Sequence, residues 1–162
     1  MNGIEFHKTD EYMWAWGRKI HCWSKVRNEL NGLRDVGYPV VYSENEDGTE
    51  GSPYMPRDFP IGEWKVTGLT FHPDQIRDHY LYPLFIKTNA HQTVRIWLQE
   101  NGVYTRKTDE IIEDYGYGNH FSDSMTTLGC VRDEKEEDIR FVANQIRIFL
   151  QKNEVIPFIV LP

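Results

Sequence analysis

The stretch that decides the fold is DEKEEDIRFVANQIRIFLQKNEVIPFIVL, residues 133–161. A 3.6-residue apolar stripe, typical of an amphipathic helix, runs through Ile139, Val142, Ala143, Ile146, Phe149 and Leu150. Asp133 with Glu136 three residues later matches a capping box, and acids crowd the first turn, where the helix dipole favours them. Residues 155–161 form a strand, in which Pro157 indicates a sheet edge or a strand start. The stretch therefore predicts one long helix and a closing strand.

Most of the chain before this helix is predicted to be β-strand. Segments rich in β-branched and aromatic residues are 11–16, 19–26, 38–43, 84–88, 93–98 and 103–105, and residues 59–68 are predicted to be a turn leading into a strand. Turn signals at Gly17-Arg18 and Asn101-Gly102 predict two hairpins. Residues 44–57, with acids, glycines and prolines, form the clearest loop, and a loop of this length is usually functional. The fold class is mostly β (α+β) in one domain, residues 1–162.

Composition and charge exclude several classes of function. A chain of 162 residues suits one domain, and a net charge of −7 argues against a nucleic-acid binder. No apolar run approaches the roughly 20 residues that span a bilayer, and residues 1–8 do not resemble a secretory signal. We therefore expect the protein either to work inside the cell that makes it or to leave by lysis, a dedicated secretion machine or attachment to a larger particle. Two cysteines, Cys22 and Cys130, make no disulfide framework, although one Cys22–Cys130 bridge remains open.

Cys130 is the strongest candidate for chemistry. It follows a Gly/Ser/Thr-rich segment, residues 115–129, and precedes the predicted helix, whose N-terminal N–H groups would lower the pKa of a nearby thiol. Arg132 adds a positive charge, and Gly129 lets the backbone approach a substrate carbonyl. His120 lies ten residues upstream, across a turn that could return it to the thiol, and a Cys–His pair is the minimum for nucleophilic acyl transfer. A buried structural cysteine beside a surface histidine is the alternative.

Three segments together resemble the L,D-transpeptidase (YkuD) family. Residues 127–132, TLGCVR, resemble the family's nucleophile motif, residues 59–66, FPIGEWKV, resemble its Pro-x-Gly strand, and residues 116–120, GYGNH, resemble the segment of its general-base histidine. The resemblance covers residues 38–162, and residues 1–37 would be N-terminal strands of the same domain. Leu128 departs from the family, which has a histidine there, and His120 is closer to Cys130 than the family spacing.

The resemblance implies an L,D-transpeptidase-like β-sandwich or barrel and a reaction. The Cys130 thiolate attacks a carbonyl of a peptidoglycan stem peptide or muropeptide, and His120 takes the thiol proton and returns it to the leaving amine. N–H groups around Gly129 and Cys130 hold the oxyanion, and Arg132 holds a substrate carboxylate unless it only pairs with neighbouring acids. An amine or water then resolves the acyl-enzyme, without cofactor or metal. With this activity the protein would act at the bacterial cell wall after lysis or a dedicated export, as a phage protein or secreted effector would, and otherwise in the cytoplasm. Further expected substrate-site residues are Tyr117, Asn119, Ser124 and Thr127, the last two by orienting His120.

Other readings remain open. His91 is a second candidate for the base; the alternative is a surface histidine at a strand end without a catalytic role. His72, Asp78, His79 and His91 could ligate a metal, but their spacing matches no compact metal motif. A catalytically inactive binding module of the same fold is the main alternative, with Leu128 as a sign of lost catalysis. The reactivity of the Cys130 thiol separates these classes.

Overall fold

Most of the chain forms β-strands that are organised as a barrel and a smaller sheet. The structure is a computed structural model that describes residues 2–24, 41–43, 59–71, 84–100, 103–121 and 130–162. The barrel strands are β1 (Ile4–His7), β2 (Tyr12–Ala15), β3 (Arg18–Trp23), β5 (Gly62–Phe71), β6 (Leu84–Thr88), β9 (Gly118–Phe121), β10 (Val131–Asp133) and β11 (Pro157–Leu161). The smaller sheet contains β4 (Val41–Ser43), β7 (Gln92–Glu100) and β8 (Val103–Asp114).

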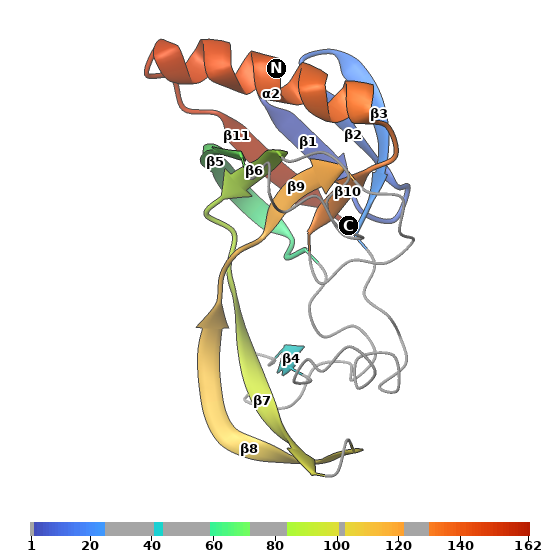
Figure 1. The fold of residues 1–162 in the computed structure, drawn as a ribbon, viewed down its shortest axis with the longest axis vertical. Helices are drawn as coiled ribbons and strands as arrows, with labels where there is room; N and C mark the ends of the chain where they lie inside the picture. Colours follow the sequence, from blue (N-terminus) through green and yellow to red (C-terminus); the bar gives the residue numbers. More distant parts are fainter. Residues whose placement is uncertain (1, 25–40, 44–58, 72–83, 101–102, 122–129) are drawn as a thin grey trace.

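The barrel is closed, with the strand order β1-β11-β5-β6-β9-β10-β3-β2. The pairs β1–β11 and β9–β10 are parallel, and the other six pairs are antiparallel. Figure 1 shows the β7–β8 hairpin extending away from the barrel on the side opposite the helix. The predicted mostly β architecture with one helix near the C-terminus is therefore confirmed for the described residues.

The predicted N-terminal hairpin is confirmed, with its turn at Trp16-Gly17. Both residues have positive φ, 47° and 80°, which is typical of the type I′ turn that joins twisted antiparallel strands. This conformation costs a non-glycine residue about 1–2 kcal/mol. The Trp16 ring stacks on Phe149 of the helix, with centroids 5.6 Å apart, so a tertiary contact offsets the local cost. The strand β1 was not predicted.

The helix α2 (Glu136–Gln151) lies across the barrel in Figure 1. It buries most of the predicted stripe, but Leu150 at the end of the stripe is exposed. Ile139, Val142 and Ile146 are fully buried, and each such side chain contributes roughly 1.5–3 kcal/mol relative to exposure. The predicted cap is wrong. The N-cap is Lys135, which makes no side-chain cap, whereas Asp133 is a buried residue of β10. The acidic first turn is present as predicted.

The closing strand β11 is an interior strand of the barrel rather than an edge. It pairs in parallel with β1 and antiparallel with β5, and Pro157 is its first residue, where a missing N–H is tolerated. Phe158 and Val160 point into the core, where Phe158 stacks on Phe59 at 5.2 Å. The pairing of β11 with β1 also joins the C-terminal strand to the N-terminal meander, the antiparallel strands β1, β2 and β3.

The other predicted strands are found with different bounds. β5, β6 and β7 match their segments, and Glu100 pairs with Val103 across residues 101–102, as a two-residue hairpin requires. β8 begins at Val103, as predicted for the return strand, and extends to Asp114. The predicted strand 38–43 is described only at 41–43, and the predicted loop 44–57 lies outside the described residues.

Candidate active site

The segment of His120 and the segment of Cys130 lie side by side. β9 and β10 pair in parallel, with Asn119 opposite Val131 and His120 opposite Arg132. Opposite residues of paired strands project to the same face of a sheet, so His120 and Arg132 share one face. These two side chains are buried, at 4% and 1% exposure. Neither strand was predicted: the sequence placed His120 in a loop and Arg132 at a helix start.

Cys130 directly precedes β10 and is half-buried. Its Sγ lies 3.8 Å from the backbone oxygen of Gly116, to which the thiol can donate. The expected position at a helix N-terminus is wrong, because β10 intervenes and α2 begins only at Glu136. The helix dipole acts within about one turn, so it does not act on this thiol. Cys130 is not in a disulfide, and neither is Cys22.

The opposite face of the β9–β10 pair points into the barrel. Asn119 is fully buried, and its Nδ2 donates to the Val131 oxygen at 3.1 Å and to Asp133 Oδ1 at 2.9 Å. Burial, together with the neighbouring Asp138, raises the pKa of Asp133 to about 8, although the Asn119 hydrogen bond lowers it. Cys22 pairs with Asp133 in register, and burial raises the pKa of its thiol well above the ordinary value. Asn119, an expected substrate contact, is therefore part of an interior polar cluster.

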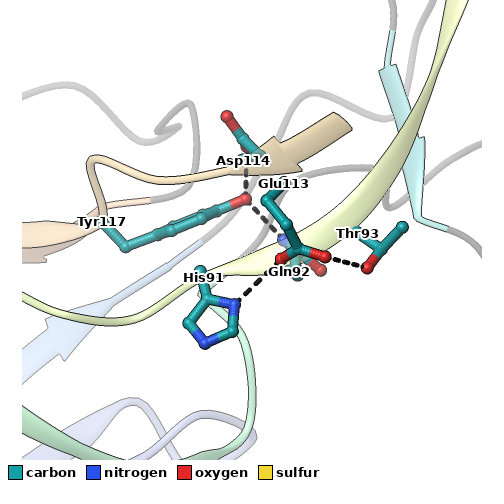
Figure 2. Close-up of polar contacts among 6 residues, drawn as sticks. All are labelled: His91, Gln92, Thr93, Glu113, Asp114 and Tyr117. Carbon is teal, nitrogen blue, oxygen red and sulfur yellow. Dashed lines mark hydrogen bonds and ion pairs between the residues drawn. The ribbon is translucent and has the colours of Figure 1, made fainter. Parts of the chain in front are cut away.

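Tyr117, another expected substrate contact, is 2% exposed. Its hydroxyl donates to Asp114 Oδ2 at 2.6 Å and accepts from Gln92 Nε2 at 2.6 Å, as Figure 2 shows. Its backbone oxygen accepts from Thr88 Oγ1 at 2.5 Å. These contacts fasten the base of the β7–β8 hairpin to the start of β9.

A second histidine, His91, lies on the exposed surface. His91 Nδ1 is 2.9 Å from Glu113 Oε2, and the other oxygen of Glu113 accepts from Thr93 Oγ1 (Figure 2). Hydrogen bonds from Thr93 and His91 lower the pKa of Glu113. The Tyr115 ring stacks on His91 at 5.3 Å, and Gly116 follows Tyr115 beside the Cys130 thiol. Glu113 was missed by sequence reasoning, because its partnership depends on the β7–β8 register.

The remaining expected site residues lie outside the described residues: Ser124, Thr127, Gly129, His72, Asp78 and His79. Within the described ranges, no group of three or more potential ligands could hold a metal ion. No helix there is long and apolar enough to cross a membrane. No family model, curated protein or solved structure matches the chain.

Proposed function

We propose that this protein is a cysteine acyl-transfer enzyme of the L,D-transpeptidase type, acting on peptidoglycan stem peptides. The observation that carries the proposal is the parallel pairing of β9 with β10, which brings the His120 and Cys130 segments together. The chain order supports it too: the Pro60-x-Gly62 segment that leads into β5, His120, Cys130, a long helix and a closing strand follow one another as in that family.

The reaction starts with transfer of the Cys130 proton to a histidine. The thiolate attacks a peptide carbonyl, forming the C–S bond, and the oxyanion is held by backbone N–H groups at Cys130. Collapse of this intermediate breaks the C–N bond, and the histidine protonates the leaving amine. An amine or water then attacks the thioester and releases Cys130.

Arg132 fits this reaction as a fixed charge rather than as a substrate clamp. Its side chain is only 1% exposed, and it lies on the same face as His120, two residues after Cys130. A buried guanidinium acts through a low effective dielectric, so it favours the thiolate without touching substrate. An incoming carboxylate would need a more exposed arginine.

Two histidines compete for the role of base. His120 is diagonal to Cys130 across the β9–β10 pair, which in ideal parallel strands separates the Cα atoms by roughly 8 Å. Direct transfer then needs one bridging water or a rotamer change. His91 is exposed and held by Glu113, and its ring stacks on Tyr115, the residue before the Gly116 whose oxygen contacts the thiol. We assign the base to His120, since it shares the sheet face next to the thiol, and keep His91 as the alternative.

The decisive experiment is incubation with purified muropeptides, read by mass spectrometry. Wild type should give a shortened or cross-linked product and an acyl adduct on Cys130. Cys130→Ala should give neither, whereas the matched control Cys22→Ala should give both. The absence of product and adduct from wild type would refute the proposal.

The base is assigned by comparing the activities of His120→Asn and His91→Asn under conditions where circular dichroism shows both variants to be folded. Loss of a general base costs about 10²- to 10⁴-fold in kcat and removes the limb of the pH–rate profile that reports its titration. We expect this for His120→Asn, with His91→Asn close to wild type. The opposite pattern would assign the base to His91.

The burial of His120 and Arg132 favours a second candidate, a binding module without turnover. Such a module would bind muropeptides with equal affinity in wild type and Cys130→Ala. It would form no adduct. The same incubation therefore separates the two functions.

A further inference from the structure

A groove lies on the outer face of the N-terminal meander, away from Cys130. In the β1–β2 pair, Ile4 and Ala15 point into the core, whereas Glu5 lies opposite Trp14 on the outer face. Trp14 is 41% exposed, unusually high for an indole in a strand. The groove has a volume of about 270 Å³ and is lined by Gly3, Glu5, Trp14, Trp16 and Gly17.

The lining combines two indoles with one carboxylate and two glycines. A Cβ on Gly17 would meet nothing within 4 Å, so the space beside this residue is open. Indole rings offer flat apolar surfaces, and an ionised Glu5 offers only hydrogen-bond acceptors. The Trp16 indole projects from a turn position that favours Asn, Asp or Gly, at φ 47°. Its packing against Phe149 of α2 offsets this local cost and places the ring beside the groove.

The side chains of the groove are already held in place. Glu5 Oε1 is 2.8 Å from His7 Nε2, and the Trp16 ring stacks on Phe149. Lys19 Nζ lies 6.0 Å from the centroid of the Trp14 ring and 4.4 Å from that of Tyr12. Because these groups are fixed before a ligand arrives, binding loses little side-chain entropy.

We propose that this groove binds a neutral saccharide, with one pyranose ring against Trp14 and Trp16 and its hydroxyls donating to Glu5. A sugar ring presents C–H groups on its faces and O–H donors around its rim, which complements both indoles and the carboxylate. A purely aliphatic side chain would desolvate Glu5 without a donor. A cationic ligand would be repelled by Lys19, which already lies over Trp14.

A neighbouring depression differs in character and is not part of this proposal. It has a volume of about 380 Å³ and is lined by Asp10, Glu11, Tyr12, Lys19 and His21. Its charged groups of both signs suit an ionic ligand rather than a neutral ring. Saccharide binding in the first groove does not depend on the Cys130 reaction, so the two proposals are tested separately.

The test is a titration of the protein with chitotetraose and with maltotetraose, followed by the NMR signals of the five indole N–H groups. At least one sugar should shift the signals of Trp14 and Trp16 in a saturable way. Trp14→Ala should weaken binding by at least about tenfold, and Glu5→Gln should weaken it less. Phe71→Ala removes a comparably exposed ring, at 60%, and should bind as wild type does.

Three outcomes would overturn the proposal: no saturable shift with either sugar, shifts confined to other indoles, or unchanged binding by Trp14→Ala. Cys130→Ala should bind the sugar as wild type does. Sugar binding by Cys130→Ala without muropeptide turnover by wild type would support the groove while refuting the enzyme.

Discussion

Cys22 and Cys130 lie in opposite surroundings. Cys22 is fully buried inside the barrel, beside a carboxyl group whose pKa is raised to about 8. Cys130 is half-buried before β10, where its thiol contacts the backbone oxygen of Gly116. Burial in an apolar interior disfavours a thiolate, whereas contact with solvent and polar groups permits it. The same chemical group is thus suited to packing in one region and to reaction in the other.

The two faces of the β9–β10 pair explain this division. The inner face carries Asn119 and Asp133, which are joined in the core by a hydrogen bond of 2.9 Å from Asn119 Nδ2 to Asp133 Oδ1. The outer face carries His120 and Arg132, and Cys130 directly precedes the strand that contains Arg132. Substitutions on the inner face should therefore change stability, and those at Cys130 should change reactivity.

The largest effect is expected from the pH dependence of unfolding. Asp133 stays protonated in the folded state up to about pH 8 but ionises at about pH 4 when unfolded, so the unfolded state loses its proton first as the pH rises. As the pH rises from about 4 to about 8, the free energy of unfolding should therefore fall. The slope should approach 1.4 kcal/mol per pH unit, and the whole loss should be several kcal/mol. Urea unfolding at several pH values measures this loss.

Asp133→Asn is the matched variant, since an amide keeps an acceptor for Asn119 and cannot ionise. Its stability should change far less across the same pH range. An equally steep fall in this variant would show that another group carries the dependence.

The next effect concerns thiol reactivity. At pH 7, iodoacetamide should alkylate Cys130 roughly 100-fold faster than Cys22, because Cys22 reacts only when the barrel opens. Peptide mapping of the carbamidomethyl groups gives both rates in one sample. In denaturant the two rates should converge, whereas similar rates in the folded protein would contradict the contrast between the two regions.

The smallest effect comes from the ion pair above the interior cluster. Arg18 lies 2.8 Å from Asp138, whose side chain is 9% exposed and faces the same cluster. Arg18→Met should destabilise the protein by about 1–2 kcal/mol, between the ranges for exposed and buried pairs. Arg140→Met removes the exposed Arg140–Glu136 pair and should cost about 0.5 kcal/mol or less. Thermal unfolding of both variants gives the comparison.

Local patterns predicted the elements that local physics determines. The apolar stripe of residues 139–150 predicted the helix, and turn residues predicted both hairpins. These signals lie within a few residues of one another, so no tertiary information is needed. The nucleophile hypothesis came from the motif around Cys130, and it remains a prediction.

Tertiary pairing determined what the sequence could not predict. β9 has four residues and β10 has three, and two residues of each are polar or charged. They become strands only because each has neighbours on both sides in the barrel. Asp133 matches a capping box but is drawn into β10, so tertiary placement overrode the local signal. Arg132 and Asp133 are buried although such residues are usually exposed. The His91–Glu113 pair depends on the strand register in the same way.

The β7–β8 hairpin leaves the barrel after β6 and returns directly into β9, and β6 and β9 are themselves neighbours in the barrel. Topologically, the hairpin is an elongated connection between two adjacent antiparallel strands, where a tight turn would serve equally well. Its length is therefore free to vary without any change in strand order or barrel closure. Natural insertions, deletions and engineered fusions should be tolerated at its far end, provided that the hydrogen bonds of Tyr117 with Gln92 and Asp114 at its base are kept.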